Sequence, residues 1–131
     1  MDSPHFFVDR SLGGVTVPRL LREADWELTT LVEHYGKPAD EDVADVDWLA
    51  LAGQNNWPVL MKDEKIRYRA AERAALVDAG VRAFCLASGN LKSADMAELF
   101  IQHRATIWQR ASGDGPGLWV VSRSEVRRTD V

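Results

Sequence analysis

The sequence predicts an α/β protein with a mostly parallel central sheet and helices on both faces of that sheet. Short apolar runs that suit buried strands alternate along the chain with segments of helical periodicity. The chain has 131 residues, 46% of them hydrophobic, which is enough for one domain with a sizeable core. We therefore expect residues 1–131 to form a single domain.

Short runs rich in apolar and β-forming residues predict the strands. They lie at 5–9, 26–31, 58–61, 81–87 and 118–123. The segment 34–42 contains Gly36 and Pro38 and is predicted to be a loop. Residues 124–131 are predicted to be a polar tail.

Four segments between these runs predict helices, at 17–24, 44–55, 70–79 and 93–110. Pro18 is tolerated because it lies in the first turn of the first helix. Gly80 is placed to end the third helix, and Ser93 to cap the fourth. His103 falls on the apolar stripe of the fourth helix, where we expect a hydrogen-bonded core histidine.

Composition and charge exclude several classes of protein. The net charge is −4, so the chain is not a protein that bulk positive charge holds on nucleic acid. No apolar run approaches the ~20 residues that a membrane-spanning helix needs, and the first residues do not form a secretory signal. The single cysteine, Cys85, excludes an internal disulfide. We expect a cytoplasmic protein.

Three aspartates occupy positions that favour convergence. Asp9 ends the first apolar run, and Asp63 follows the third with one residue between. The carboxyl ends of parallel strands meet at one edge of a sheet, where ligands bind. Asp45 opens the second helix and lies on the same stripe as Trp48 and Leu49, so it is expected to face the sheet. Three converged carboxylates predict a Mg²⁺ or Mn²⁺ site, because a cation is needed to offset their repulsion.

Other charges nearby allow two interpretations. Asp47 lies on the flank of the same helix and is either an acid that supports the site or a surface charge. The acids of this helix could also serve only its N-terminal dipole. Lys62 and Arg67 belong to a basic cluster around Asp63 that suits contact with a phosphodiester, or forms a solvated helix face.

Other catalytic schemes fit the sequence less well. The chain contains neither a Gly-x-Ser-x-Gly elbow nor a P-loop, and Gly13-Gly14 lack the dinucleotide-binding spacing. A phospho-receiver would need an acidic pair after the first strand and a lysine after the last. Here Asp9 is followed by Arg10, and no lysine follows residues 118–123.

Four motifs occur in an order that resembles the PIN-like domains, in particular the VapC-type toxins of toxin–antitoxin pairs. They are Phe-Val-Asp-Arg-Ser-Leu-Gly at 7–13, Asp-x-x-Trp-Leu-x-Leu-Ala at 45–52, Val-Leu-Met-Lys-Asp-x-x-Ile-Arg at 59–67, and Leu-Ala-Ser-Gly-Asn-Leu at 86–91. The resemblance implies a three-layer, Rossmann-like α/β/α sandwich, a metal-dependent ribonuclease, and an antitoxin that blocks its pocket. The sequence departs from the family after the fourth strand, where PIN domains often carry an Asp and this chain has Ser88 and Asn90.

By this resemblance the reaction is hydrolysis of RNA by a divalent ion that binds a phosphate oxygen and activates water. The expected metal ligands and catalytic acids are Asp9, Asp45 and Asp63, with Asp47 as a further catalytic candidate. The expected RNA-binding residues are Arg10, Lys62, Arg67 and Asn90. The alternative is a module that binds RNA or protein without cutting, on the same fold with an incomplete acidic site. The sequence leaves the oligomeric state open, and a homodimer is one of the assemblies it allows.

Overall fold

A computed structural model of the chain describes residues 3–62, 66, 68–87 and 91–131. Its centre is a sheet with the strand order β2-β1-β3-β4-β5-β6. The strands are β1 (His5–Val8), β2 (Glu27–Thr30), β3 (Val59–Met61), β4 (Arg82–Leu86), β5 (Gly117–Val121) and β6 (Val126–Thr129). All neighbouring pairs are parallel except β5 and β6. The mostly parallel sheet is confirmed.

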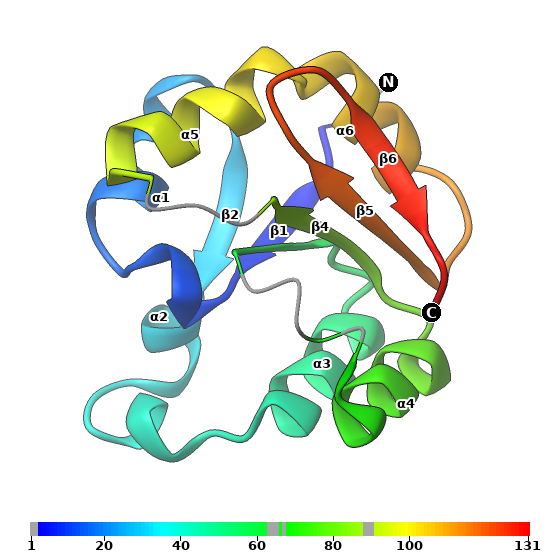
Figure 1. Cartoon of the computed structure of the whole chain (residues 1–131). Coiled ribbons are helices and arrows are strands. Elements are labelled where there is room, and N and C mark those ends of the chain that lie inside the picture. Colours follow the sequence, from blue (N-terminus) through cyan, green and yellow to red (C-terminus); the bar gives the residue numbers. More distant parts are fainter. Residues whose placement is uncertain (1–2, 63–65, 67, 88–90) are drawn as a thin grey trace.

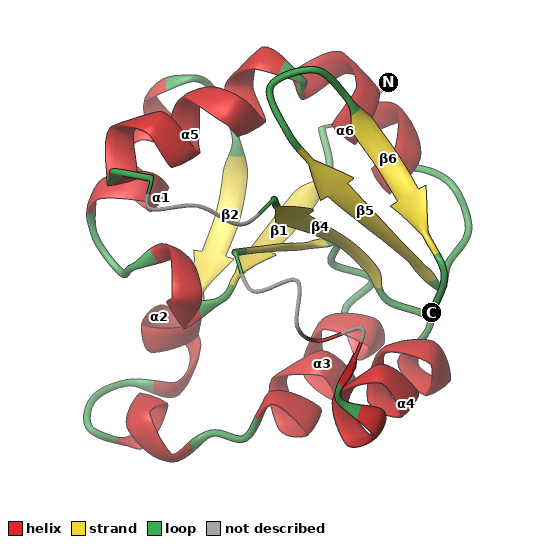
Figure 2. Cartoon of the chain, viewed as in Figure 1, coloured by secondary structure: helices red, strands yellow, loops and turns green. Residues whose placement is uncertain are grey.

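Helices cover both faces of this sheet, which completes the predicted three layers (Figures 1 and 2). The α-helices are α1 (Thr16–Glu23), α2 (Leu31–Tyr35), α3 (Asp45–Gln54), α4 (Ala70–Ala79), α5 (Ser93–Gln102) and α6 (Arg104–Ala111). Two short 3₁₀ helices, η1 (Arg10–Leu12) and η2 (Ala39–Asp42), lie in the connections. Within the described ranges, no helix is long and apolar enough to cross a membrane.

Alternate residues of the strands supply two separate hydrophobic cores. Phe6 and Val8 of β1 pack with residues of α1, α5 and α6, whereas Phe7 packs with residues of α3 and α4. Successive side chains of a strand point to opposite faces, so a strand buried on both faces contributes to both cores. Gly80, with φ of 68°, ends α4 as predicted.

The predicted helix 93–110 is two helices, and Ser93 does not cap the first. His103 separates α5 from α6 with φ −101° and ψ 19°, and its Nε2 lies 2.7 Å from the carbonyl oxygen of Ser122. The expected hydrogen-bonded histidine is therefore found, at a bend that apolar periodicity alone does not reveal. Lys92 occupies the cap position of α5, without a side-chain hydrogen bond, and Ser93 is already helical.

Two segments predicted to be irregular contain regular structure. The segment 34–42 includes the end of α2 and all of η2, and the tail 124–131 includes β6. β6 is an edge strand that pairs only with β5 and places Arg128 over the ring of Trp119, 5.4 Å from its centroid. Its half-exposed, charged sequence lacks the apolar run on which strand prediction depends.

Candidate active site

The order of the strands reverses between β1 and β3, and we call the carboxyl edge of the sheet at this point the crevice. The chain leaves β1 to form β2 on one side, and then returns to form β3 on the other side. At such a reversal the two connections diverge, so a ligand site opens at the carboxyl edge of the sheet. Val8 pairs with Leu60 in register, which places Asp9 directly after β1 beside the end of β3.

Asp9 is 7% exposed, and its two carboxylate oxygens have different surroundings. Oδ2 accepts hydrogen bonds from the Ser11 hydroxyl at 2.7 Å and the Ser11 amide at 3.3 Å. Oδ1 is buried and has no hydrogen-bond partner in the described part of the chain. Burial raises the pKa of Asp9, the hydrogen bonds from Ser11 oppose that rise, and the negative charge of Asp45 adds to it.

Ser11 connects the ends of the two strands that flank the crevice. Its hydroxyl donates to Asp9 and accepts a hydrogen bond from the Lys62 amide at 3.0 Å. Ser11 is not among the site residues predicted from the sequence. The Asp-x-Ser spacing was an available signal, because an Asp side chain commonly accepts from the amide two residues later.

Asp45 is the first residue of α3 and is half-buried. Its Oδ1 accepts a hydrogen bond from the indole Nε1 of Trp48 at 2.9 Å. Trp48 is 1% exposed and stacks on Phe7, with ring centroids 5.6 Å apart. The predicted stripe is present, since Trp48, Leu49 and Ala52 are the buried residues of α3. One rigid aromatic contact thus fixes a carboxylate on the side of the sheet opposite α1.

The other predicted site residues divide into two groups. Asp47 is exposed, and its charge is a secondary cause, after burial, of the raised pKa of Tyr35. Arg10 donates to the carbonyl oxygens of Glu41, at 3.3 Å, and Val43. Its guanidinium therefore fastens the segment before α3 to η1, and a role in RNA binding stays a prediction.

Lys62 directly follows β3 and has a half-buried side chain. Asp63, Arg67 and Asn90 lie outside the described residues, so their predicted roles stay predictions.

A hard divalent cation needs several oxygen ligands, and carboxylates supply them best. Among the described residues, no group of three or more His, Cys, Asp or Glu could hold a metal ion. Two of the three predicted ligands, Asp9 and Asp45, are described, and the negative charge of Asp45 contributes to the raised pKa of Asp9. A buried carboxylate oxygen without a partner beside a second carboxylate is the chemistry that Mg²⁺ or Mn²⁺ requires. Asp9 and Asp45 therefore have the chemistry of two ligands of such an ion.

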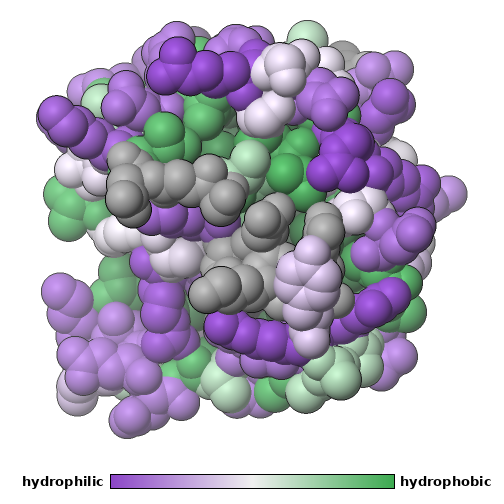
Figure 3. Space-filling model, viewed as in Figure 1, coloured by the Kyte–Doolittle hydropathy of each residue, from purple (hydrophilic) through white to green (hydrophobic). Residues whose placement is uncertain are grey.

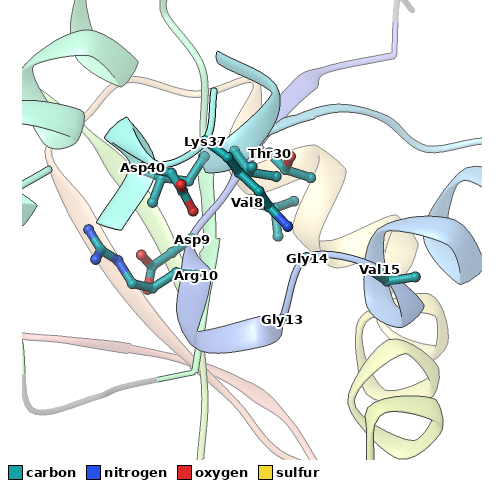
Figure 4. Close-up of a pocket in the computed structure, with 11 residues that line it drawn as sticks. Val8, Asp9, Arg10, Gly13, Gly14, Val15, Thr30, Lys37 and Asp40 are labelled. Atoms are coloured by element: carbon teal, nitrogen blue, oxygen red, sulfur yellow. The ribbon is translucent and has the colours of Figure 1, made fainter. Parts of the chain in front are cut away.

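A pocket of about 270 Å³ opens next to Asp9, on the side of β2. Gly13 and Gly14 line it from one side, and Lys37 and Asp40 line it from the α2–η2 segment (Figure 4). Hydrophilic side chains gather over this α2–η2 region in the space-filling view (Figure 3). Lys37 and Asp40 are not among the predicted site residues, because Gly36 and Pro38 indicate only a loop at 34–42.

Comparison with known proteins assigns the chain to a family. The family model described as "PIN like domain" matches residues 4–88. The chain therefore belongs to the PIN-like domain family. It is also 39% identical, over 127 residues, to "Putative ribonuclease VapC45" of Mycobacterium tuberculosis. That alignment covers 97% of this chain and 92% of the relative. No solved structure matches the chain significantly.

Proposed function

We propose that this protein is a Mg²⁺- or Mn²⁺-dependent endoribonuclease and the toxin of a toxin–antitoxin pair. The observation that carries the proposal is the buried, unpartnered Oδ1 of Asp9 at the crevice between β1 and β3, with the charge of Asp45 close by. The PIN-like family and the ribonuclease name of the relative support the same function.

Asp9, Asp45 and Asp63 are the residues that would hold the ion. When bound, the ion supplies Lewis-acid polarisation of a phosphate oxygen and activation of a water for attack on phosphorus. Ser11 holds Oδ2 of Asp9 and so leaves Oδ1 as the free ligand atom. Trp48 fixes the carboxylate of Asp45 in the same way. Hydrogen bonds that orient ligands in this manner usually matter for both affinity and activity.

Positive charge is needed to bring the RNA backbone to this acidic crevice. Lys62 follows β3 and its backbone amide donates to Ser11, so we propose that its ammonium group offsets charge on the transition-state phosphate. Arg67 and Asn90 are proposed to contact the RNA backbone on the grounds of sequence position alone.

The proposal is tested by cleavage of total RNA at millimolar Mg²⁺ or Mn²⁺. Wild type should cut RNA, Asp9→Asn should lose activity, and Ser11→Ala should lose about 10- to 100-fold, because Asp9 is then less well oriented. Glu98→Gln, on the exposed face of α5, is the matched control and should retain activity. Melting temperature gives a second readout, since the ion should stabilise wild type and not Asp9→Asn.

Undiminished cleavage by Asp9→Asn would exclude this acidic site as the catalyst. If wild type neither cuts RNA nor responds thermally to the ion, the function becomes that of a binding module without catalysis. The sequence feature that agrees with such a module is the presence of Ser88 and Asn90 where PIN domains often carry an Asp.

A toxin of this kind requires an inhibitor, and we extend the proposal to a cognate antitoxin in the same cytoplasm. An Arg or Lys of the partner could bind Asp9 and Asp45 in place of the metal ion, since charge-assisted hydrogen bonds are stronger than neutral ones. Inhibition would then compete directly with ion binding.

A further inference from the structure

We propose that the pocket beside Asp9 is a subsite for one nucleotide of the RNA, and that it favours a base with an exocyclic amino group over uracil. The proposal rests on the ribonuclease function and adds base selectivity to it. We call this cavity the Asp40 pocket; it lies between Val8 and Asp9 at the end of β1, Gly13 and Gly14 after η1, and Lys37 and Asp40 beyond α2.

The size of the Asp40 pocket suits one nucleoside. Its volume of about 270 Å³ is close to the lower end of small-molecule sites, which span roughly 300–1,000 Å³. Val8, Leu31 and Val32 supply apolar surface for a base. A longer stretch of RNA would have to continue past Asp9, where the proposed cutting site lies.

The two glycines leave the entrance open. A Cβ added at Gly13 would meet no heavy atom within 4 Å, and one added at Gly14 would meet only Val32 Cγ1 at 3.9 Å. Gly13 has φ of +82°, which favours glycine, whereas Gly14 does not have a conformation restricted to glycine. A larger residue at Gly14 can therefore fill the pocket without backbone strain.

Asp40 supplies an acceptor at the wall of the pocket. Its Oδ1 is buried and lacks a hydrogen-bond partner among the described residues. The backbone around it is held in place, because the Asp40 amide donates to Gly36 at 2.8 Å and Arg10 binds the carbonyl oxygen of Glu41. In Figure 4 the Asp40 carboxylate points into the space between its own segment and Asp9.

Such an acceptor discriminates between bases. Carboxylates accept hydrogen bonds from exocyclic amines, and single-stranded RNA exposes these groups on its Watson–Crick edges. Guanine, adenine and cytosine each carry an amine, whereas uracil carries carbonyl oxygens on both sides of one N–H, which a carboxylate repels. A carboxylate with an oxygen that lacks a partner among the described residues, as in Asp40, therefore favours the three amino-bearing bases.

Lys37 supplies the complementary charge for a phosphate. Its exposed side chain reaches across Val8 towards Gly13 and Gly14 in Figure 4, and it forms no ion pair with any described residue. A cation at the mouth and a carboxylate inside match a nucleotide whose phosphate stays outside while its base enters. A free phosphate would instead meet the carboxylates of Asp9 and Asp40.

Calorimetric titration with 5′-monophosphates of guanosine, adenosine, cytidine and uridine, in a metal chelator, tests the subsite without cleavage. The three amino-bearing nucleotides should bind about tenfold more tightly than uridine monophosphate. Asp40→Asn should remove most of this difference, because an amide can also donate. Asp42→Asn, an exposed acid of the same 3₁₀ helix, should leave the difference unchanged. Lys37→Gln should weaken all four nucleotides by a similar factor.

Filling the pocket provides an independent check. Gly14→Leu should abolish nucleotide binding. Gly113→Leu should not, since Gly113 precedes β5, which β3 and β4 separate from β1, and a Cβ there meets Arg110 O at an ordinary 3.5 Å. Melting temperatures show whether each variant folds. If Gly14→Leu does not fold, the binding of nucleotides by Asp40→Asn and Lys37→Gln tests the subsite instead.

Equal affinity for all four nucleotides, or unchanged binding by folded Gly14→Leu, would overturn the subsite. The nuclease proposal is decided separately by cleavage of total RNA. Cleavage without base discrimination rejects only the subsite, and discrimination without cleavage rejects only the nuclease.

Discussion

At the scale of single residues, Ser11 divides the two oxygens of Asp9 into a held atom and a free atom. Oδ2 receives both hydrogen bonds of Ser11, whereas Oδ1 is buried without a partner in the described structure. A charged oxygen in this state lowers the stability of the fold, because desolvation is not offset by a hydrogen bond. The unpartnered Oδ1 therefore destabilises the free protein, and binding of a metal ion or of a cationic side chain from a partner would restore that stability.

The raised pKa of Asp9 predicts how stability depends on pH. In the window between the ordinary value of 3.8 and the raised native value, the folded protein retains a proton that the unfolded chain has lost. Stability is therefore fully retained below the unfolded value and falls as pH rises through the native value. Asp9→Asn removes this loss and should be more stable than wild type at neutral pH by about 1 kcal/mol.

Urea unfolding in a chelator, from acid to neutral pH, measures this difference. The stabilisation by Asp9→Asn should shrink as the pH approaches 3.8. A difference that stays constant over the whole range would show that the mutation acts through packing and not through the charge.

Sequence rules predicted the positions of Asp9 and Asp45 more readily than the groups that hold their side chains. Asp9 and Asp45 follow from the strand-end and helix-stripe rules, which need only local spacing. The bond between Ser11 and Lys62 joins residues 51 positions apart, so local spacing carries no signal for it. The bond from Trp48 to Asp45 depends on the rotamer of a residue that was assigned only to the core.

At the scale of elements, α2 and η2 form the wall that carries Lys37 and Asp40. A capping box begins α2, since the Thr30 hydroxyl accepts from the Glu33 amide and the Glu33 carboxylate accepts from the Thr30 amide. The salt bridge from Arg22, 2.7 Å long, lowers the pKa of Glu33 and keeps it charged for this role. The Thr-x-x-Glu pattern was present in the sequence, but Gly36 and Pro38 shortly after it favoured a loop.

Thr30→Ala should therefore destabilise the protein by about 1 kcal/mol, because it removes the acceptor for the Glu33 amide. Urea unfolding gives the magnitude, and hydrogen exchange should show faster exchange at the amides of 33–36. Thr30→Ser keeps the hydroxyl and should retain most of the stability. If serine and alanine cost the same, the lost methyl group and not the cap accounts for the change.

At the scale of the whole molecule, alternation of strands and helices was enough to predict the parallel sheet and its three layers. Each of the first four strands is an apolar or β-rich run followed by a helical segment, which is the βα pattern of parallel sheets. β6 was missed because an antiparallel edge strand needs backbone pairing on one side only and tolerates charged residues. The missed strand does not affect the predicted position of Asp9, which depends on the neighbouring strands β1 and β3.

The charge of the whole molecule bears on its regulation. A net charge of −4 attracts cationic partners over a distance, so the proposed binding of RNA would depend on local cations. A cationic antitoxin segment would thus be drawn to the acidic crevice, and the RNA of the proposed reaction would contact Lys62 and Lys37. Expression in a bacterial host should therefore arrest growth, and co-expression of the protein encoded by the neighbouring gene should restore it.

Asp9→Asn, Asp63→Ala and Asp42→Asn separate the acidic crevice from other causes of toxicity. The first two remove proposed ligands and should permit growth at equal protein level, whereas the third changes an exposed acid of η2 and should arrest growth like wild type. Loss of charge in Asp9→Asn should also weaken binding of the neighbouring protein, and added salt should weaken binding to wild type. Arrest by all variants alike would place the toxic activity outside the crevice, because no function of this acidic site survives removal of its buried acid.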